Sequence, residues 1–238
     1  MTNKLTNVKA ILFDLDETLI DALTGLRAAH KAVSEKVVDY FPSKLSNHDI
    51  GVLQRKLLEL DDEMNLQTHY DRDEWWPEFL DRIGVDHELE SSQIKELSQV
   101  YWSTYIQTAK PCENAKPTLE YLRKRDLALG IVTDTDSSGE SKKRRIAKLD
   151  FTNYLDIIIV GGEDTEQTKP SPEPFKLAAK KLGLKPSECA MIGDKPFTDI
   201  KGAKTAGMKT ILLERREWNS EETPDLTINS LEELQNLF

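Results

Sequence analysis

The stretch Val8-Lys9-Ala10-Ile11-Leu12-Phe13 runs directly into Asp14-Leu15-Asp16-Glu17-Thr18-Leu19, and this junction decides the fold. An apolar run with β-branched and aromatic residues is typical of a strand that is covered on both faces, as in a parallel sheet. Open α/β sheets bind ligands at the carboxyl ends of their strands, so Asp14 and Asp16 are expected at that edge. Two carboxylates so close together are unfavourable unless a cation neutralises them. The pattern therefore predicts a magnesium site with one Asp free to attack a substrate, which makes the chain an enzyme candidate.

The rest of the chain has two kinds of pattern. Residues 22–110 are helical in pattern almost throughout, with no convincing strand. After Pro117, short apolar runs alternate with amphipathic stretches of helical length, and these runs are residues 127–133, 157–160, 189–193 and 208–213. This alternation predicts an α/β fold, a doubly wound, Rossmann-like parallel sheet covered by helices. We expect residues 1–20 and 117–238 to form this core, and residues 21–116 to form an inserted all-α domain.

The composition limits the partners of the chain. Its 238 residues carry a formal net charge of -10, with a sequence pI near 5.0. Such a surface repels nucleic acid and anionic membranes, so neither is an expected partner, whereas a local cation cluster could still bind a small anionic molecule. We expect a monomer or a homodimer.

Two features of the sequence bear on location. Cys112 and Cys189 are far apart and lack metal-ligand spacing, which favours two free thiols over a disulfide. No apolar run approaches the roughly 18 residues of a membrane span, and the N-terminal run is interrupted by Asp14 without a cleavage site after it. We therefore expect a cytoplasmic protein.

Polar and charged residues follow the later apolar runs. The second strand candidate ends Gly130-Ile131-Val132-Thr133-Asp134, which leaves a hydroxyl and a backbone N–H exposed. Lys169 follows the third, and Pro170 keeps it out of the helical conformation. Asp194 and Asp199 follow the fourth. In a doubly wound sheet these strand ends converge in one crevice, together with the two Asp residues that follow the first strand.

This set of side chains suits phosphoryl transfer, in which positioning and charge neutralisation supply most of the catalysis. Magnesium prefers hard oxygen ligands and keeps several waters, so two carboxylates and a backbone carbonyl suffice from the protein. One Asp could attack phosphorus to form an aspartyl phosphate, while a second protonates the leaving oxygen and later deprotonates water. Thr133 and Lys169 would bind the transferring phosphoryl oxygens.

Taken in order, these motifs resemble the haloacid dehalogenase superfamily, in its phosphatase branch with a helical cap after the first motif, as in phosphoglycolate phosphatases. The resemblance covers residues 7–238, and the four motifs are specific only when they occur together. The matching positions are Asp14-x-Asp16-x-Thr18 for the first motif, Thr133 for the second, Lys169 for the third, and Gly193-Asp194 with Asp199 for the fourth. Family phosphatases often have Gly where this chain has Glu17.

The resemblance implies a role for each residue. Asp14 would be the nucleophile and Asp16 the general acid/base. Magnesium would be held by Asp14, the Asp16 carbonyl and Asp194, with support from Asp199. The substrate phosphate would be bound by Thr133, Asp134 and Lys169. The helical insertion would be the cap that closes over the site and helps to select the substrate.

These roles predict a magnesium-dependent phosphatase that acts on small phosphate monoesters through an aspartyl phosphate. By family resemblance the substrate could be phosphoglycolate, a triose phosphate, a sugar phosphate or a nucleoside monophosphate. One alternative is a phosphomutase of the same superfamily, which returns the phosphoryl group to a bound intermediate. Another is a phosphate-binding scaffold without turnover. Dehalogenation fits less well, because dehalogenating members are not expected to have an acid/base Asp at position 16.

The basic run Lys142-Lys143-Arg144-Arg145 could suggest nucleic-acid binding. Acidic residues flank it, and Ile146 and Leu149 follow at helical spacing. We interpret it instead as one solvated face of a helix.

Overall fold

The computed structural model describes residue 5 and residues 7–45, 48–86, 88–136 and 142–238. The described residues form two compact units. The first takes its residues from the ranges 1–21, 111–135 and 142–238, and the second from 22–110 together with Asp136. The assignment of a core at 1–20 and 117–238 and a cap at 21–116 stays a prediction.

A six-stranded sheet forms the centre of the first unit, in the order β5-β4-β1-β6-β7-β8. Every neighbouring pair is parallel. The strands are β1 (Ala10–Phe13), β4 (Ala128–Asp134), β5 (Ile157–Gly161), β6 (Cys189–Gly193), β7 (Lys209–Leu213) and β8 (Leu226–Ile228). The predicted α/β fold with a doubly wound parallel sheet is therefore confirmed.

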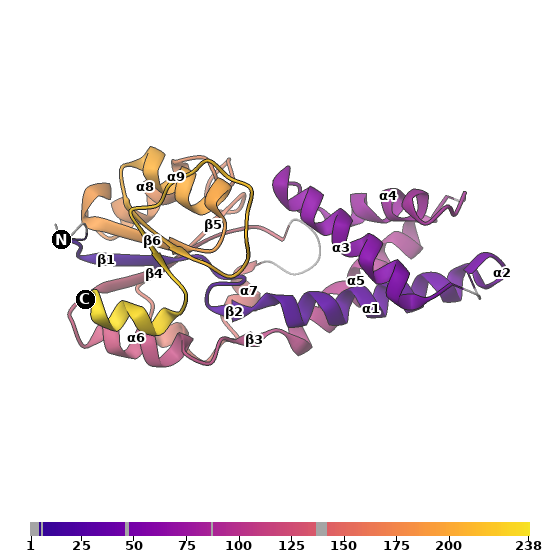
Figure 1. Ribbon diagram of the computed structural model, residues 1–238, viewed down its shortest axis with the longest axis horizontal. Helices are drawn as coiled ribbons and strands as arrows, with labels where there is room; N and C mark the ends of the chain where they lie inside the picture. Colours follow the sequence, from indigo (N-terminus) through magenta and orange to yellow (C-terminus); the bar gives the residue numbers. More distant parts are fainter. Residues whose placement is uncertain (1–4, 6, 46–47, 87, 137–141) are drawn as a thin grey trace. The chain divides into compact units, whose positions relative to one another are not determined.

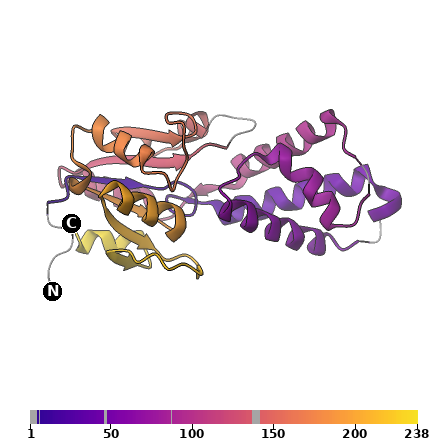
Figure 2. The same ribbon diagram turned by 90° about the horizontal axis from the view of Figure 1, so that it is seen from above.

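β1 lies between β4 and β6 (Figures 1 and 2), so the strand order reverses at β1. Phe13 is in register with Ile131 on one side and with Ile192 on the other. The carboxyl ends of these three strands therefore lie next to one another, where a doubly wound fold places its ligands.

Helices cover both faces of this sheet (Figure 1). On one face lie α8 (Glu173–Lys181) and α9 (Lys201–Ala206), and on the other lies α6 (Ala115–Arg123), against the 3₁₀ helix η5 (Leu231–Asn236). Shorter elements are α7 (Lys142–Ile146), the 3₁₀ turns η2 (Thr152–Tyr154) and η3 (Pro186–Glu188), and the π-helical turn η4 (Pro196–Ile200). Every residue of β1 and β6 is buried between these helices, which explains why these central strands have no polar face.

The second unit is helical. Its elements are α1 (Ala22–Tyr40), α2 (Pro42–Leu45), α3 (Ile50–Leu66), the 3₁₀ turn η1 (Arg72–Glu74), α4 (Trp75–Arg82) and α5 (Ser91–Thr108). Trp76, Phe79 and Tyr101 are fully buried in its core. Asp49 caps α3 by accepting a hydrogen bond from the N–H of Gly51 at 2.8 Å. The unit therefore has an apolar core of its own.

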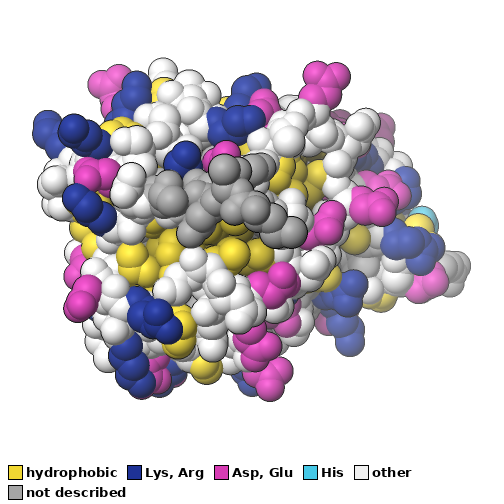
Figure 3. All heavy atoms as spheres, turned by 60° about the vertical axis from the view of Figure 1, so that its left-hand side comes forward, with side chains coloured by type: hydrophobic (Ala, Val, Ile, Leu, Met, Phe, Trp, Pro, Cys, Tyr) yellow, Lys and Arg dark blue, Asp and Glu magenta, His cyan; other side chains and the backbone are white. Residues whose placement is uncertain are grey.

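Two short strands, β2 (Ile20–Asp21) and β3 (Lys110–Pro111), pair where the chain passes between the units. None of the described helices is both long and apolar enough to span a membrane. On the face drawn in Figure 3, the described basic and acidic side chains are interspersed rather than separated into large patches.

Candidate active site

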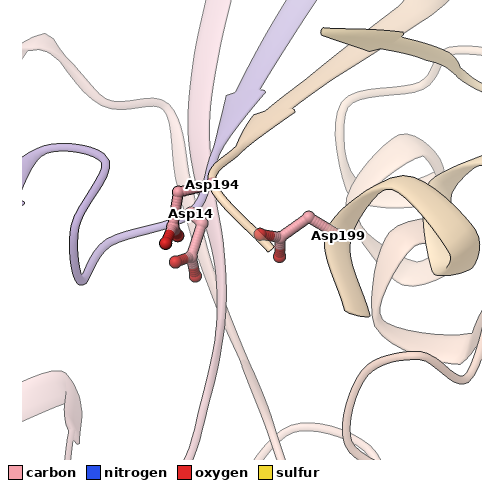
Figure 4. Close-up of side chains that lie close together, drawn as sticks. All are labelled: Asp14, Asp194 and Asp199. Carbon is pink, nitrogen blue, oxygen red and sulfur yellow. The ribbon is translucent and has the colours of Figure 1, made fainter. Parts of the chain in front are cut away.

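Three buried aspartates meet at the carboxyl end of the central strands. Asp14 follows β1 directly, and its backbone N–H donates to the carbonyl of Ile192 at 2.8 Å, so the ladder to β6 continues past the strand. Asp194 follows β6, and Asp199 lies in the π-helical turn η4. One carboxylate oxygen from each Asp lies within 4.8 Å of the other two. Figure 4 shows the carboxylates of Asp14 and Asp194 beside each other, with that of Asp199 directed toward them.

Lys169 joins two of these aspartates. Its Nζ lies 2.7 Å from Oδ1 of Asp14 and 2.6 Å from Oδ1 of Asp199, and all three side chains are buried. Burial alone would lower the pKa of Lys169, but the charges of Asp14, Asp199 and Asp134 outweigh it and hold that pKa well above its ordinary value. Lys169 is therefore a fixed cation within the acidic cluster.

Asp134 supports this lysine from the end of β4. Its Oδ1 accepts a hydrogen bond from the backbone N–H of Lys169 at 2.9 Å. Burial raises the pKa of Asp134, and the charge and N–H of Lys169 partly oppose that rise. The neighbouring Thr133, also predicted to bind phosphate, is buried at the same strand end. The phosphate-binding roles of Thr133, Asp134 and Lys169 stay predictions.

The Asp194 carboxylate is buried, and neither of its oxygens has a hydrogen-bond partner among the residues that the structure describes. Burial raises the pKa of Asp194 well above its ordinary value, Lys195 opposes the rise, and Asp199 and Asp14 add to it. Buried carboxylates are normally paired or coordinate a metal, because burial without a partner is costly. Buried carboxylate oxygens from several Asp residues are the donors that a hard divalent cation prefers. The cluster therefore fits a divalent metal ion.

Asp199 links Lys169 to the loop after β6. Its second oxygen accepts a hydrogen bond from the N–H of Lys195 at 3.1 Å. Burial raises the pKa of Asp199 to about 6, with Lys169 opposing and Asp14 adding to the rise. A Cβ atom on Gly193 would lie only 2.2 Å from Oδ2 of Asp199, so this close approach requires glycine. Whether Asp199 also supports a metal stays a prediction.

Asp16 has a different environment. Its carboxylate faces two basic residues of α7: Lys142 Nζ lies 2.6 Å from Oδ2, and Arg145 Nη2 lies 3.2 Å from the same oxygen. Lys142 and Arg145 are buried, whereas Lys143 and Arg144 are exposed. The prediction that the whole basic run is a solvated helix face is therefore wrong. The spacing of three between the two buried cations places them on one side of the helix.

The segment after β7 also reaches the site, which the sequence did not suggest. The indole Nε1 of Trp218 donates to the backbone carbonyl of Asp194 at 2.9 Å. Arg215 Nε donates to the carbonyl of Glu17 at 3.1 Å. Glu17 has a φ of 62°, a left-handed conformation that favours glycine, which explains the glycine that family phosphatases often have there.

Residues 11–213 match the family model described as haloacid dehalogenase-like hydrolase. The chain belongs to this family. Glyceraldehyde 3-phosphate phosphatase of Methanopyrus kandleri is 30% identical, in an alignment that covers 95% of each chain. The crystal structure of a HAD (haloacid dehalogenase-like) phosphatase from Thermococcus onnurineus is 26% identical, covers 97% of both chains and has a TM-score of 0.67. The putative HAD-hydrolase YfnB of Bacillus subtilis, 23% identical over 97% of this chain and 98% of its own, shares the fold with a TM-score of 0.74.

In this haloacid dehalogenase-like hydrolase, four of the predicted site residues form one buried cluster, namely Asp14, Lys169, Asp194 and Asp199. Asp134 contacts the cluster through the backbone of Lys169. Asp16 instead lies against the cations of α7. The cluster can bind a cation and also offers the carboxylate of Asp14, whereas the carboxylate of Asp16 lies outside the cluster.

Proposed function

We propose that this haloacid dehalogenase-like hydrolase is a magnesium-dependent phosphatase, which hydrolyses phosphate monoesters of small metabolites through an aspartyl phosphate on Asp14. The proposal depends above all on one observation: the buried carboxylate of Asp14 is held by Lys169 beside an Asp194 carboxylate without a described hydrogen-bond partner. The relative from Methanopyrus kandleri is named for the hydrolysis of a triose phosphate, which supports a phosphate ester of similar size as the substrate.

In the first half-reaction, a carboxylate oxygen of Asp14 attacks phosphorus, and the bond from phosphorus to the ester oxygen breaks. Asp16 donates a proton to the departing oxygen, so an alcohol leaves. In the second half-reaction, Asp16 accepts a proton from a water molecule that attacks phosphorus. The acyl phosphate bond breaks, inorganic phosphate leaves, and the Asp14 carboxylate is restored.

Lys169 and Thr133 bind the phosphoryl oxygens in this proposal, while the Lys169 ammonium also fixes the orientation of Asp14. Asp14, the carbonyl of Asp16 and Asp194 would hold magnesium, and Asp199 would support them. When bound, magnesium supplies positive charge that neutralises the phosphoryl oxygens. Asp134 keeps Lys169 in place by accepting a hydrogen bond from the backbone N–H of Lys169.

We extend the proposal to the helical unit, which we take as a cap (residues 21–116) that closes over the site and selects the substrate. The paired strands β2 and β3 are then the connections through which the cap moves. Cys112 and Cys189 are both free, which supports a reducing, cytoplasmic location.

Phosphate release from a panel of esters tests the proposal. The panel contains phosphoglycolate, glyceraldehyde 3-phosphate, sugar phosphates and nucleoside monophosphates, each with magnesium or with EDTA. We compare the natural chain with Asp14→Asn and with Asp39→Asn, a matched change at an exposed position of α1. Release that needs magnesium, is lost in Asp14→Asn and persists in Asp39→Asn supports the phosphatase.

Other outcomes point elsewhere. Release that survives Asp14→Asn contradicts the proposal. Interconversion of sugar phosphate isomers without net release identifies a phosphomutase. Binding of esters with neither reaction identifies a scaffold.

A further inference from the structure

Helix α7 places two buried cations against the predicted acid/base. We propose that Lys142 and Arg145 are positioning residues, which hold the Asp16 carboxylate in the orientation needed for proton transfer. This inference rests on the proposed function, in which Asp16 exchanges protons with the leaving group and with water. Lys142 and Arg145 contact Asp16, whereas Asp14 contacts Lys169, so each carboxylate of the first motif has its own cationic partner.

The contact geometry defines both the place and the plane of the carboxylate. Lys142 binds Oδ2 at 2.6 Å. Arg145 spans both oxygens, with Nη2 at 3.2 Å from Oδ2 and Nη1 at 3.4 Å from Oδ1. A guanidinium that faces both oxygens orients a carboxylate as an ammonium alone does not. Because proton transfer requires hydrogen-bond reach, a small displacement of Asp16 would be costly for catalysis.

Because Lys142 and Arg145 are buried, they do more than make the surface of the helix soluble. The side chains of Lys142 and Arg145 are 6% and 5% exposed, whereas that of Asp16 is 26% exposed. Burying a Lys or Arg is unfavourable unless it is paired, and the two neighbouring cations of the same helix are exposed. The Asp16 carboxylate is therefore accessible to solvent, as proton exchange requires, whereas the side chains of Lys142 and Arg145 that hold it are shielded from solvent.

The helix itself is attached to the sheet. The backbone N–H of Lys142 donates to Oε1 of Glu163 at 3.1 Å, and Lys143 pairs with Asp164. Asp164 in turn accepts a hydrogen bond from the N–H of Val160, in β5, at 2.8 Å. The cations are thus positioned from the end of β5, the strand whose following loop also carries Lys169. One side of the sheet therefore orients both carboxylates of the first motif.

The test compares two esters that differ in their need for an acid. An alkoxide leaving group must be protonated, whereas nitrophenolate leaves without a proton. We measure kcat/KM, which reports the first half-reaction, for glyceraldehyde 3-phosphate and for p-nitrophenyl phosphate. The variants are Lys142→Met and Arg145→Met, with Asp16→Asn as the reference. Arg144→Met is the matched control, because it removes an exposed cation of the same helix to which the attachment of the helix assigns no contact.

We expect Lys142→Met and Arg145→Met to lower kcat/KM for the alkyl ester by about 100-fold, the scale of general acid catalysis, and by less than about tenfold for the nitrophenyl ester. Asp16→Asn should show the same selectivity, and Arg144→Met should behave as the natural chain. In the double variant Asp16→Asn with Arg145→Met, the second change should add little, because residues that act as a unit are not additive. Arg145→Lys should recover part of the loss.

Equal losses on both esters, or full additivity in the double variant, would overturn the proposal, since Arg145 would then act on the phosphate or on the fold. Crystal structures of Lys142→Met and Arg145→Met give a second readout that needs no turnover. A displaced Asp16 carboxylate supports the positioning role, and an unmoved one overturns it. If the natural chain hydrolyses no ester, the proposed function fails, while these structures still decide whether the cations position Asp16.

Discussion

Nζ of Lys169 lies 2.7 Å from Oδ1 of Asp14, although 155 positions separate the two residues in the chain. The same ammonium lies 2.6 Å from Asp199, so a single buried cation pairs with two carboxylates. Breaking a buried pair from one side leaves uncompensated charge, which usually costs more than the pair itself contributes.

Lys169→Met is therefore expected to destabilise the protein by about 3–5 kcal/mol, because Asp14 and Asp199 remain buried without their cation. Urea unfolding in EDTA measures the change. Lys176→Met, at an exposed position of α8, is the control and should have little effect. Adding Asp199→Asn to Lys169→Met should restore part of the loss. If the free energy of unfolding of Lys169→Met is unchanged, Lys169 does not stabilise buried charges on Asp14 and Asp199.

Asp194→Asn should separate stability from metal binding. The substitution removes a buried carboxyl group that lacks a described hydrogen-bond partner and whose ionisation burial opposes, so the metal-free protein should unfold at a temperature a few degrees higher, given about 2–4 °C per kcal/mol for a chain of this size. The magnesium-induced rise of the melting temperature should disappear, because a ligand is lost. Differential scanning calorimetry with magnesium and with EDTA checks both. If Asp194→Asn melts at a lower temperature than the natural chain in EDTA, or if magnesium still raises its melting temperature, the assignment of Asp194 as a metal ligand is contradicted.

Trp218 should report on the metal site. Its indole donates to the carbonyl of Asp194 and packs edge-to-face on Phe197, with ring centroids 5.1 Å apart. Occupation of the site should therefore alter the tryptophan fluorescence. Trp218→Phe should abolish the magnesium-dependent change, whereas Trp102→Phe, in the helical unit, should preserve it. If the signal survives Trp218→Phe, the loop after β7 does not sense the metal.

The two thiols should differ in reactivity with pH. Burial raises the pKa of Cys189 to about 11, and that of Cys112 is also raised by burial, with Arg215 opposing. Because the thiolate is the reactive form, a raised pKa keeps Cys189 protonated and unreactive until the pH approaches that value. Labelling of the native protein with a disulfide reagent near pH 8.5, the ordinary thiol pKa, should be slow at Cys189 and faster at the half-buried Cys112. Fast labelling of Cys189 would contradict its burial.

The strands were predictable where burial is complete on both faces. The predicted run 189–193 coincides with β6, and all five of its residues are buried, as expected of a central strand. β8 was missed, since its three residues include an exposed Thr227 and lie at the edge of the sheet. An edge strand needs neither length nor continuous apolarity, so its local sequence carries little signal.

The site was predictable where it depends on topology alone. Asp14 and Asp194 directly follow neighbouring parallel strands, so the sheet brings them together whatever conformation the loops have. The partners of Asp16 were missed, because a run of four cations does not reveal which side of a short helix is buried. The backbone contact of Asp134 with Lys169 was missed too, since it depends on how the loop after β5 returns to the sheet.

The most direct test of the account is to trap the covalent intermediate. Enzyme, magnesium and the best ester are mixed, quenched in acid during the first turnover, and digested for tandem mass spectrometry. The account predicts one phosphoryl group on Asp14, absent from Asp14→Asn and formed at least as fast as phosphate is released. Phosphate release without any label on Asp14, or a label on another residue, would contradict it.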